Sequence, residues 1–189
     1  ARLLSLARLV EKKGLEYAIR AAARLRHLNF CYDIVGDGPM RGDLQKLIAE
    51  LGLAERVRLL GWKQQTEVLA LLNEAHILVA PSVTGADGDQ EGIPVAMMEA
   101  MAMGLPVVST LHSSIPELVA DGDSGYLVPE RDVEALADRI GNLLQSPERW
   151  PALGAAGRRR VEAEFNLNRL HDALVERFQA LAPPGRATP

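Results

Sequence analysis

Short apolar runs alternate with longer amphipathic stretches along most of the chain. Six runs of four to six residues are rich in Leu, Ile and Val and are predicted to be strands: 3–7, 30–35, 57–60, 77–80, 106–110 and 125–128. The run Ile77-Leu78-Val79-Ala80 contains no polar residue. Continuous apolar strands are typical of a sheet that is covered on both faces.

The amphipathic stretches between and after these runs predict helices. They cover 15–28, 40–51, 66–73, 94–103, 133–144, 148–164 with a break near Gly154 to Gly157, and 167–181. Strands that alternate with helices predict an α/β fold, here a Rossmann-like three-layer α/β/α domain with a mostly parallel sheet of about six strands. We expect this domain to span residues 1–165. A separate C-terminal helix is predicted at 166–182, followed by a frayed tail at 183–189.

The stretch from Glu91 to Pro106 stands out because it is so apolar. Pro94 suits the first turn of a helix and Gly104 suits its end. Glu99 is the only formally charged residue between Glu91 and Glu117, so we expect the helix to be buried on most faces. A buried carboxylate requires a partner, which is either another protein group or a polyhydroxylated ligand. The free N–H groups at the start of the helix are predicted to attract phosphate.

Two cations, Arg8 and Lys13, flank the first strand-to-helix loop. An arginine fork and a mobile lysine charge together suit two adjacent phosphates, although either residue could be an ordinary solvated charge. Because the carboxyl ends of parallel strands meet at one edge of a sheet, ligands bind there. The loops predicted at that edge contain Arg8, the turn 36–38, Gly61-Trp62, the loop 81–92 and Thr110.

Two other features at this edge have simple structural explanations. The turn Gly36-Asp37-Gly38-Pro39 lacks the third glycine of a dinucleotide-binding fingerprint, since Arg41 occupies that position. It is equally consistent with a strand end capped by Asp37. His112 follows the fifth predicted strand, and a lone histidine is expected to be a surface or capping group rather than a catalytic base.

Composition excludes several classes of function. A chain of 189 residues with 48% hydrophobic and 24% charged residues fits one ordinary globular domain. The net charge of −4 argues against nucleic acid as a partner. No apolar run is long enough to span a bilayer, and the chain shows no signal-peptide pattern.

We predict no metal site. The acidic residues Asp87, Asp89 and Glu91 alternate as calcium ligands do, but their loop lacks the glycine and the distal glutamate of a calcium-binding loop. Cys31 is the single cysteine and is expected to be structural, in a reducing compartment.

Taken in chain order, these motifs resemble a known family. They are 8–14, 35–39, 60–62, Pro81-Ser82, Glu91 and Glu99 with seven residues between them, 100–108, 115–119 and Gly125. The chain resembles the C-terminal, donor-binding half of a retaining family 4 glycosyltransferase of the GT-B fold, over nearly its full length. The acidic insertion 83–90 is similar to that of exopolysaccharide enzymes such as those of amylovoran and colanic acid synthesis.

The resemblance implies roles for individual residues. Arg8 and Lys13 would hold the nucleotide diphosphate and balance the charge on the leaving phosphate, Glu91 would face the donor sugar, and Glu99 would accept hydrogen bonds from the ribose hydroxyls. We count Glu91, Arg8 and Lys13 as the catalytic candidates. The other predicted contacts with the donor are Gly36, Gly38, Gly61, Trp62, Gly92, Ile93, Pro94 and Val95, with Trp62 lying against the base.

The implied function is transfer of a sugar from a nucleotide diphosphate sugar, with a uridine diphosphate sugar expected, to a saccharide or lipid-linked acceptor in polysaccharide synthesis. No separate cofactor is expected. In this family an N-terminal domain supplies the acceptor site, so this chain alone is expected to be inactive, and the last helix would cross back to that domain with Leu170, Leu174 and Phe178 partly exposed. The resemblance implies a cytoplasmic location, and attachment to the inner face of the membrane stays open.

Two alternatives to a transferase remain at this point. One is a non-catalytic module that binds nucleotide sugars, and the other is a nucleotide-sugar 2-epimerase of the same architecture. The spacing of Glu91 and Glu99, with Gly104 and Pro106 close behind, favours the transferase over the epimerase. A second sheet domain upstream in the full reading frame would favour the enzyme over the binding module.

Overall fold

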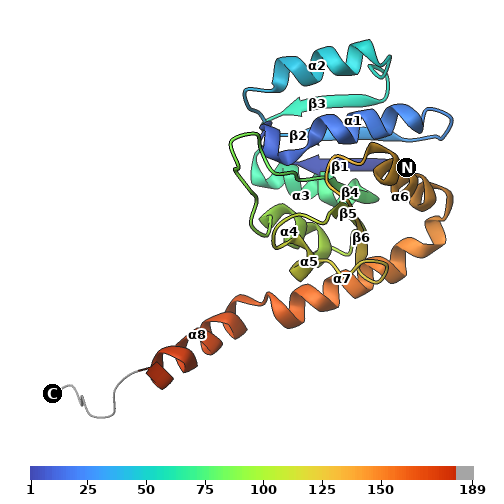
Figure 1. Cartoon of the computed structure of the whole chain (residues 1–189). Helices are drawn as coiled ribbons and strands as arrows, with labels where there is room; N and C mark the ends of the chain where they lie inside the picture. Colours follow the sequence, from blue (N-terminus) through green and yellow to red (C-terminus); the bar gives the residue numbers. More distant parts are fainter. Residues whose placement is uncertain (182–189) are drawn as a thin grey trace.

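Six parallel strands form one sheet in the computed structural model of the chain, which describes residues 1–181. The strands are β1 (Arg2–Leu6), β2 (Cys31–Val35), β3 (Val57–Gly61), β4 (Ile77–Ala80), β5 (Val107–Thr110) and β6 (Gly125–Val128). Their order is β3-β2-β1-β4-β5-β6, as the labels in Figure 1 show. The direction of strand addition therefore reverses between β1 and β4. The predicted fold class and strand number are confirmed.

Successive residues of each strand point to opposite faces of the sheet, and both faces are apolar. On β1, Leu3 belongs to one buried cluster and Leu4 to the other. In register, Leu3 pairs with Ile77 and Leu4 with Leu78, so the alternation continues across the sheet. This explains why the strand sequences show no polar alternation.

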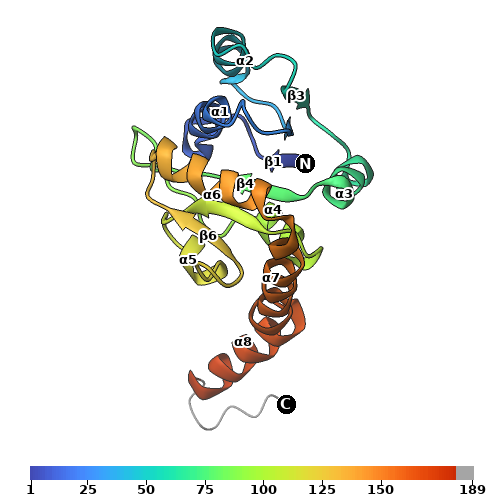
Figure 2. The same cartoon turned by 90° about the vertical axis from the view of Figure 1, so that its right-hand side faces the viewer.

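The helices form the two outer layers. They are α1 (Leu15–Arg24), α2 (Arg41–Glu50), α3 (Gln65–Glu74), α4 (Val95–Ala102), α5 (Ile115–Leu118), α6 (Val133–Gln145), α7 (Trp150–Glu164) and α8 (Leu167–Leu181), with short 3-10 helices at Glu11–Lys13 and Pro147–Arg149. Side chains of α1, α2 and α6 pack on one face, and those of α3, α4 and α5 on the other. Figure 2 shows α1 and α6 on one side of the sheet and α3 and α4 on the other.

An ion pair links the two strands at one edge of the sheet, β2 and β3. Asp33 on β2 is fully buried, and its two carboxylate oxygens accept hydrogen bonds from Arg58 Nε and Nη2 on β3 at 2.7 and 2.9 Å. The two residues are register partners in the parallel ladder. The buried charge is therefore matched by a bidentate partner, which is the geometry that stabilises an ion pair best.

The predicted break near Gly154 to Gly157 is wrong, because α7 runs without interruption through both glycines. Both are buried. A Cβ on Gly154 would lie only 1.9 Å from the carbonyl oxygen of Gly104, directly after α4. The glycines allow α7 to approach α4 closely, so they serve packing between helices and do not interrupt one.

The final helix, α8, leads away from the layered body of the molecule (Figures 1 and 2). None of its residues is buried, and its large apolar side chains are exposed: Leu167, Leu170, Leu174, Val175, Phe178 and Leu181. The expected exposure of this apolar face is confirmed. The predicted frayed tail 183–189 lies outside the described residues, as does residue 182 of the predicted helix.

Most other boundaries differ by only one or two residues from the predicted ones. The exception is α1, which ends at Arg24 rather than at 28 because Leu25 leaves the helix and residues 25–28 form a turn. The short helix α5 was not predicted.

Candidate functional site

A crevice lies at the carboxyl ends of β1 and β4, where the strand order reverses. Its first hollow is lined by residues from the end of β1, by Lys13, by Ala80 at the end of β4 and Ser82 after it, and by Pro94 and Ala96 at the start of α4. Its second hollow is lined by Arg8, Gly36, Asp37, Trp62 and Lys63, among others. Because Leu6 and Ala7 line both, the two hollows adjoin. We call them together the switch-point crevice.

Lys13 and Glu91 form an ion pair beside the first hollow. Their side chains retain 19% and 16% of their exposure, so the pair is shielded from most of the solvent. Nearby, Lys12 Nζ lies 3.0 Å from Asp89 Oδ2, and this exposed contact ties the same two loops together. No local pattern in the sequence indicates that Lys13 and Glu91 pair, because 77 residues separate them.

Arg8 and Trp62 occupy the second hollow as exposed side chains. Trp62 is 71% exposed, far more than an indole that contributes to a core. It follows Gly61, which has a φ of 75° and ends β3. A large aromatic ring left in solvent at the rim of a crevice offers a flat apolar surface to a ligand.

The predicted glycines have a packing role that the sequence did not reveal. Gly36 has a φ of 132°, and a Cβ on it would lie 1.9 Å from the carbonyl oxygen of Ala7. A Cβ on Gly38 would lie 2.5 Å from the carbonyl oxygen of Leu9. These glycines let the β2 loop pack on the β1 loop, and Asp37 caps the turn through the N–H of Gly38 at 2.8 Å. Contact of either glycine with a ligand stays a prediction.

Helix α4 is less buried than its sequence indicated. Met97, Ala100 and Met101 face the core, whereas Val95 is 63% exposed and Glu99 is half-buried. From the sequence, we expected Glu99 to be buried together with a helix that is buried on most faces. That expectation was wrong, because part of the apolar surface of α4 is exposed. Pro94 is the residue before the helix, and no side chain caps its N-terminus. Glu99 lies one turn beyond Ala96, which lines the first hollow.

The crevice thus contains only part of the predicted set. Arg8, Lys13, Gly36, Trp62 and Pro94 line it, and Glu91 joins it through Lys13. The remaining predicted residues are chain neighbours of the lining residues but do not line it themselves: Gly38, Gly61, Gly92, Ile93, Val95 and Glu99.

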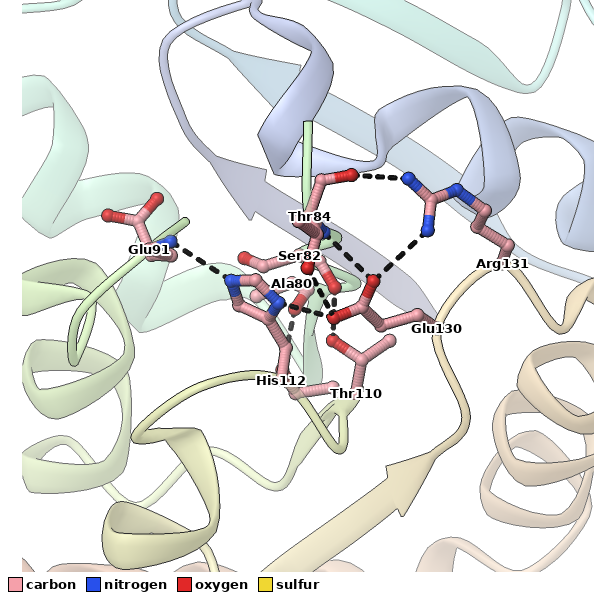
Figure 3. Close-up of polar contacts among 9 residues, drawn as sticks. Ala80, Ser82, Thr84, Glu91, Thr110, His112, Glu130 and Arg131 are labelled. Carbon is pink, nitrogen blue, oxygen red and sulfur yellow. Dashed lines mark hydrogen bonds and ion pairs between the residues drawn. The ribbon is translucent and has the colours of Figure 1, made fainter. Parts of the chain in front are cut away.

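A buried network that the sequence did not predict lies behind Glu91 (Figure 3). The backbone N–H of Glu91 donates to His112 Nε2 at 2.9 Å, and His112 Nδ1 lies 2.5 Å from Glu130 Oε1. Since Nε2 accepts, the neutral ring carries its proton on Nδ1 and donates it to the carboxylate. His112 is 1% exposed, so its predicted place at the surface is wrong, whereas the alternative of a capping group agrees with its bond to the Glu91 N–H.

Glu130 has further partners. It accepts from the backbone N–H of Thr84 at 2.9 Å and from Thr84 Oγ1 at 3.2 Å, and Arg131 Nη1 lies 3.2 Å from its second oxygen. Burial opposes ionisation of Glu130, but the Thr84 N–H and the His112 ring outweigh it, so the pKa of Glu130 is below its ordinary value. The carboxylate is therefore charged. Glu130 and His112 each lie two residues beyond the end of a strand, β6 and β5, and these strands are neighbours in the sheet. This placement is the signal that could have identified the pair.

The described residues show neither a metal cluster nor a membrane span. Within 1–181, no three His, Cys, Asp or Glu side chains are arranged to hold a metal ion, and no helix is both long and apolar enough to cross a bilayer.

Residues 1–160 match the model of the family described as glycosyl transferases group 1. Over 183 residues, the chain is 49% identical to WcaL of Escherichia coli strain K12, whose name refers to colanic acid biosynthesis, and 47% identical to the amylovoran biosynthesis glycosyltransferase AmsK of Erwinia amylovora. These alignments cover 95% and 96% of this chain but only 45% of each relative. The chain therefore spans about half the length of the relatives it matches.

Solved structures show the same fold. Sucrose-phosphate synthase from Thermosynechococcus elongatus superposes with a TM-score of 0.83 at 27% identity, covering 95% of this chain and 45% of that one. HepE of Anabaena, solved with UDP and glucose, superposes with a TM-score of 0.83 at 22% identity, covering 95% and 48%.

Proposed function

The chain belongs to the glycosyl transferases group 1 family, and on that premise we propose that its switch-point crevice binds a nucleoside diphosphate sugar for a retaining sugar transfer in polysaccharide synthesis. Glycosyltransferase activity in polysaccharide biosynthesis is the common property of its most similar relatives described above. The identity of the donor, the retaining stereochemistry and the assignment of the acceptor site to another domain are our proposals.

The observation that carries the proposal is the meeting of three anion-binding elements at one place. Lys13 and the uncapped N-terminus of α4 lie at the first hollow, and Arg8 lies at the second, which adjoins it. A lysine, an arginine and free helical N–H groups suit the two phosphates of a nucleoside diphosphate. As the bond to the sugar breaks, negative charge grows on the leaving phosphate, and these fixed charges and dipoles stabilise it.

Glu91 is placed for the sugar end of such a donor. Its carboxylate pairs with Lys13, so a phosphate that binds Lys13 competes with this pair and brings the attached sugar beside Glu91. Carboxylates accept hydrogen bonds from sugar hydroxyls, and an acceptor-only group there selects hydroxyl donors. We assign Glu91 to the sugar on these grounds.

The nucleoside is assigned to the second hollow. The exposed ring of Trp62 offers a stacking surface for the base. Glu99, half-buried one turn beyond the lining residue Ala96, is assigned to the ribose hydroxyls. We propose uridine as the base, although a relative from Mycolicibacterium smegmatis, 38% identical over 156 residues, is named as GDP-mannose-dependent.

The acceptor site is proposed to lie outside this chain. The chain corresponds to 45% of the relatives' length, and its described part forms one sheet domain. In a two-domain enzyme of this kind, a second domain faces the carboxyl edge of the sheet and brings the acceptor to the sugar. The isolated chain would then bind the donor without completing transfer. The acceptor is a saccharide or a lipid-linked saccharide, and the enzyme works in the cytoplasm or at the inner face of the membrane.

Isothermal titration calorimetry with UDP and GDP tests the proposal. We expect one of them to bind, and the variant Glu99→Ala to bind it about 1 to 3 kcal/mol more weakly, the cost of removing a hydrogen-bond partner. Glu134→Ala is the matched control, because Glu134 is an exposed glutamate on α6 whose ion pair within the described residues is with Arg24. A folded chain that binds neither nucleotide would refute the proposed function, and unchanged affinity in Glu99→Ala would remove Glu99 from its assigned role.

A further inference from the structure

We propose that Glu130 and His112 form a positioning relay that holds the backbone at Glu91 and thereby sets the sugar end of the switch-point crevice. Neither residue lines the crevice, so each is a positioning residue and not a catalytic one. The inference rests on the proposed function for its consequence, namely that Glu91 faces the donor sugar.

The first support is that one carboxylate ties together both ends of the loop that carries Glu91. At the near end, Thr84 donates to Glu130 through its backbone N–H at 2.9 Å and through its hydroxyl at 3.2 Å. At the far end, Glu130 holds His112, which accepts the N–H of Glu91 (Figure 3). The loop between Thr84 and Glu91 is exposed at most of its positions. Lys12 contacts Asp89 and Gln90 at its surface, whereas the partly buried hydrogen bonds that hold it are those at its base.

The second support is the direction of each hydrogen bond in the relay. Glu91 can donate to Nε2 only while that nitrogen is unprotonated, which places the ring proton on Nδ1. Nδ1 then needs an acceptor, and the only role open to the ionised Glu130 oxygen is to accept. The chain of bonds therefore works in one protonation state and one tautomer.

The charged groups around the ring are consistent with this state. Glu130 faces Nδ1 and is itself paired with Arg131, while the Glu91 carboxylate is directed to Lys13. The Glu91 side chain is thus free of the relay and available at the crevice, and only its backbone is held.

The third support is backbone strain directly after each relay residue. Two non-glycine residues in the described chain have positive φ, and they are Ser113 at 44° and Arg131 at 63°. Ser113 follows His112, and Arg131 follows Glu130. Non-glycine residues persist in this region only where surrounding contacts fix them, and such residues gather at functional sites.

The variant Glu130→Gln tests the relay with the smallest change of shape. If its amide group faces His112, the ring must accept at Nδ1 and carry its proton on Nε2, where it opposes the N–H of Glu91. If the amide turns the other way, it opposes the N–H of Thr84 instead. The second arrangement leaves the Glu91 N–H its acceptor, but it sets the amide against two fixed donors, the Thr84 N–H and Arg131 Nη1, so we expect the first arrangement. Glu134→Gln on the exposed surface of α6 makes the same chemical change without this conflict.

Two measurements read the result. Amide hydrogen exchange reports the Glu91 N–H directly, and we expect Glu130→Gln to exchange it about tenfold faster than wild type and Glu134→Gln, as loss of one hydrogen bond predicts. Calorimetry with UDP and UDP-glucose, and with GDP and GDP-mannose, measures how much affinity the sugar adds to that of the nucleoside diphosphate. We expect Glu130→Gln to bind the nucleoside diphosphate as wild type does and to lose the additional affinity that the sugar confers.

Variants of the ring itself separate positioning from simple packing. His112→Gln can keep an acceptor oxygen near the place of Nε2, whereas His112→Leu fills the space without one. We expect the glutamine variant to preserve more of the Glu91 amide protection, even if both variants unfold at lower temperature than wild type. Equal loss of protection in both would overturn the relay and leave only packing.

The outcomes distinguish this inference from the proposed function. If wild type binds none of the four nucleotides, the proposed function fails, while amide exchange at Glu91 still decides whether the relay exists. If nucleotides bind but Glu130→Gln retains both the protection of the Glu91 amide and the affinity for the sugar, the relay is overturned and the proposed function stands.

Discussion

Replacing Gly154 with alanine should destabilise the protein, although alanine is the better helix former. Gly154 lies inside α7, where glycine costs about 0.5 to 1 kcal/mol relative to alanine, so propensity alone predicts a gain. The added methyl group, however, would lie 1.9 Å from the carbonyl oxygen of Gly104, 2.7 Å from its carbonyl carbon and 3.3 Å from its Cα. All three atoms belong to the backbone that ends α4, so no side chain can rotate away.

The magnitude follows from the size of this overlap. Ordinary contact begins near 3.4 Å, so α7 and the end of α4 must separate, and the apolar contacts between them must loosen. Overpacking of a filled core typically costs about 1 to 3 kcal/mol, and an overlap with main chain falls at the upper end. After subtracting the gain in helix propensity, we expect Gly154→Ala to lower the free energy of unfolding by about 2 kcal/mol.

Urea unfolding followed by circular dichroism measures this difference, and Gly42→Ala is the matched control. Gly42 lies near the start of the exposed surface of α2, and a Cβ there would meet nothing within 4 Å. We expect this variant to gain up to about 1 kcal/mol from propensity. If Gly154→Ala is as stable as wild type, the close approach of α7 to α4 is not what the glycine serves, and the reasoning is refuted.

Three further predictions follow from side-chain environments. Trp62→Ala should weaken binding of the nucleoside diphosphate by about 1 to 3 kcal/mol in calorimetry while leaving urea unfolding nearly unchanged, because the ring is exposed; unchanged affinity would exclude stacking. The lowered pKa of Glu130 means that its contribution to stability is present above the ordinary carboxyl pKa of 4.5 and is lost as the pH falls through the lower value of the folded state. The unfolding free energy of wild type should therefore fall more steeply below pH 4.5 than that of Glu130→Gln, and parallel curves would contradict this. Arg58→Ala should lower the free energy of unfolding in urea by about 3 kcal/mol, because it removes both of the Arg58 hydrogen bonds to the buried Asp33 and leaves Arg2 Nε at 4.0 Å as the remaining cation. A loss below about 0.5 kcal/mol, the size of a neutral surface change, would show that Asp33 needs no partner.

The sequence predicted the fold well because its signals are local and repeated. Apolar runs such as Ile77-Leu78-Val79-Ala80 recur between amphipathic stretches, and this alternation nearly determines a parallel three-layer architecture. The edge that bears the site follows from the same pattern, since every strand runs in one direction.

The errors have a common physical origin in contacts between distant segments. The glycines of α7 indicated a break because glycine weakens an isolated helix. In the folded chain, however, the absence of a side chain at these positions allows α7 to pack closely against α4. Glu99 was expected to be buried because its helix is apolar, but part of that surface remains exposed. His112 gave no local signal at all, since its partners Glu91 and Glu130 are 21 and 18 residues away.

The strand order also governs how the site comes into being. β1 lies next to β2, but its other neighbour is β4, so the half of the sheet that contains β4, β5 and β6 must dock along an edge left open by a strand from the start of the chain. Closing loops of this length is slow compared with forming helices or local turns, so we expect the junction of β1 and β4 to form late in folding. The crevice lies at that junction. A ligand that bridges it can bind only the finished sheet and would hold the two halves together, so that the rate of unfolding should decrease as its concentration rises.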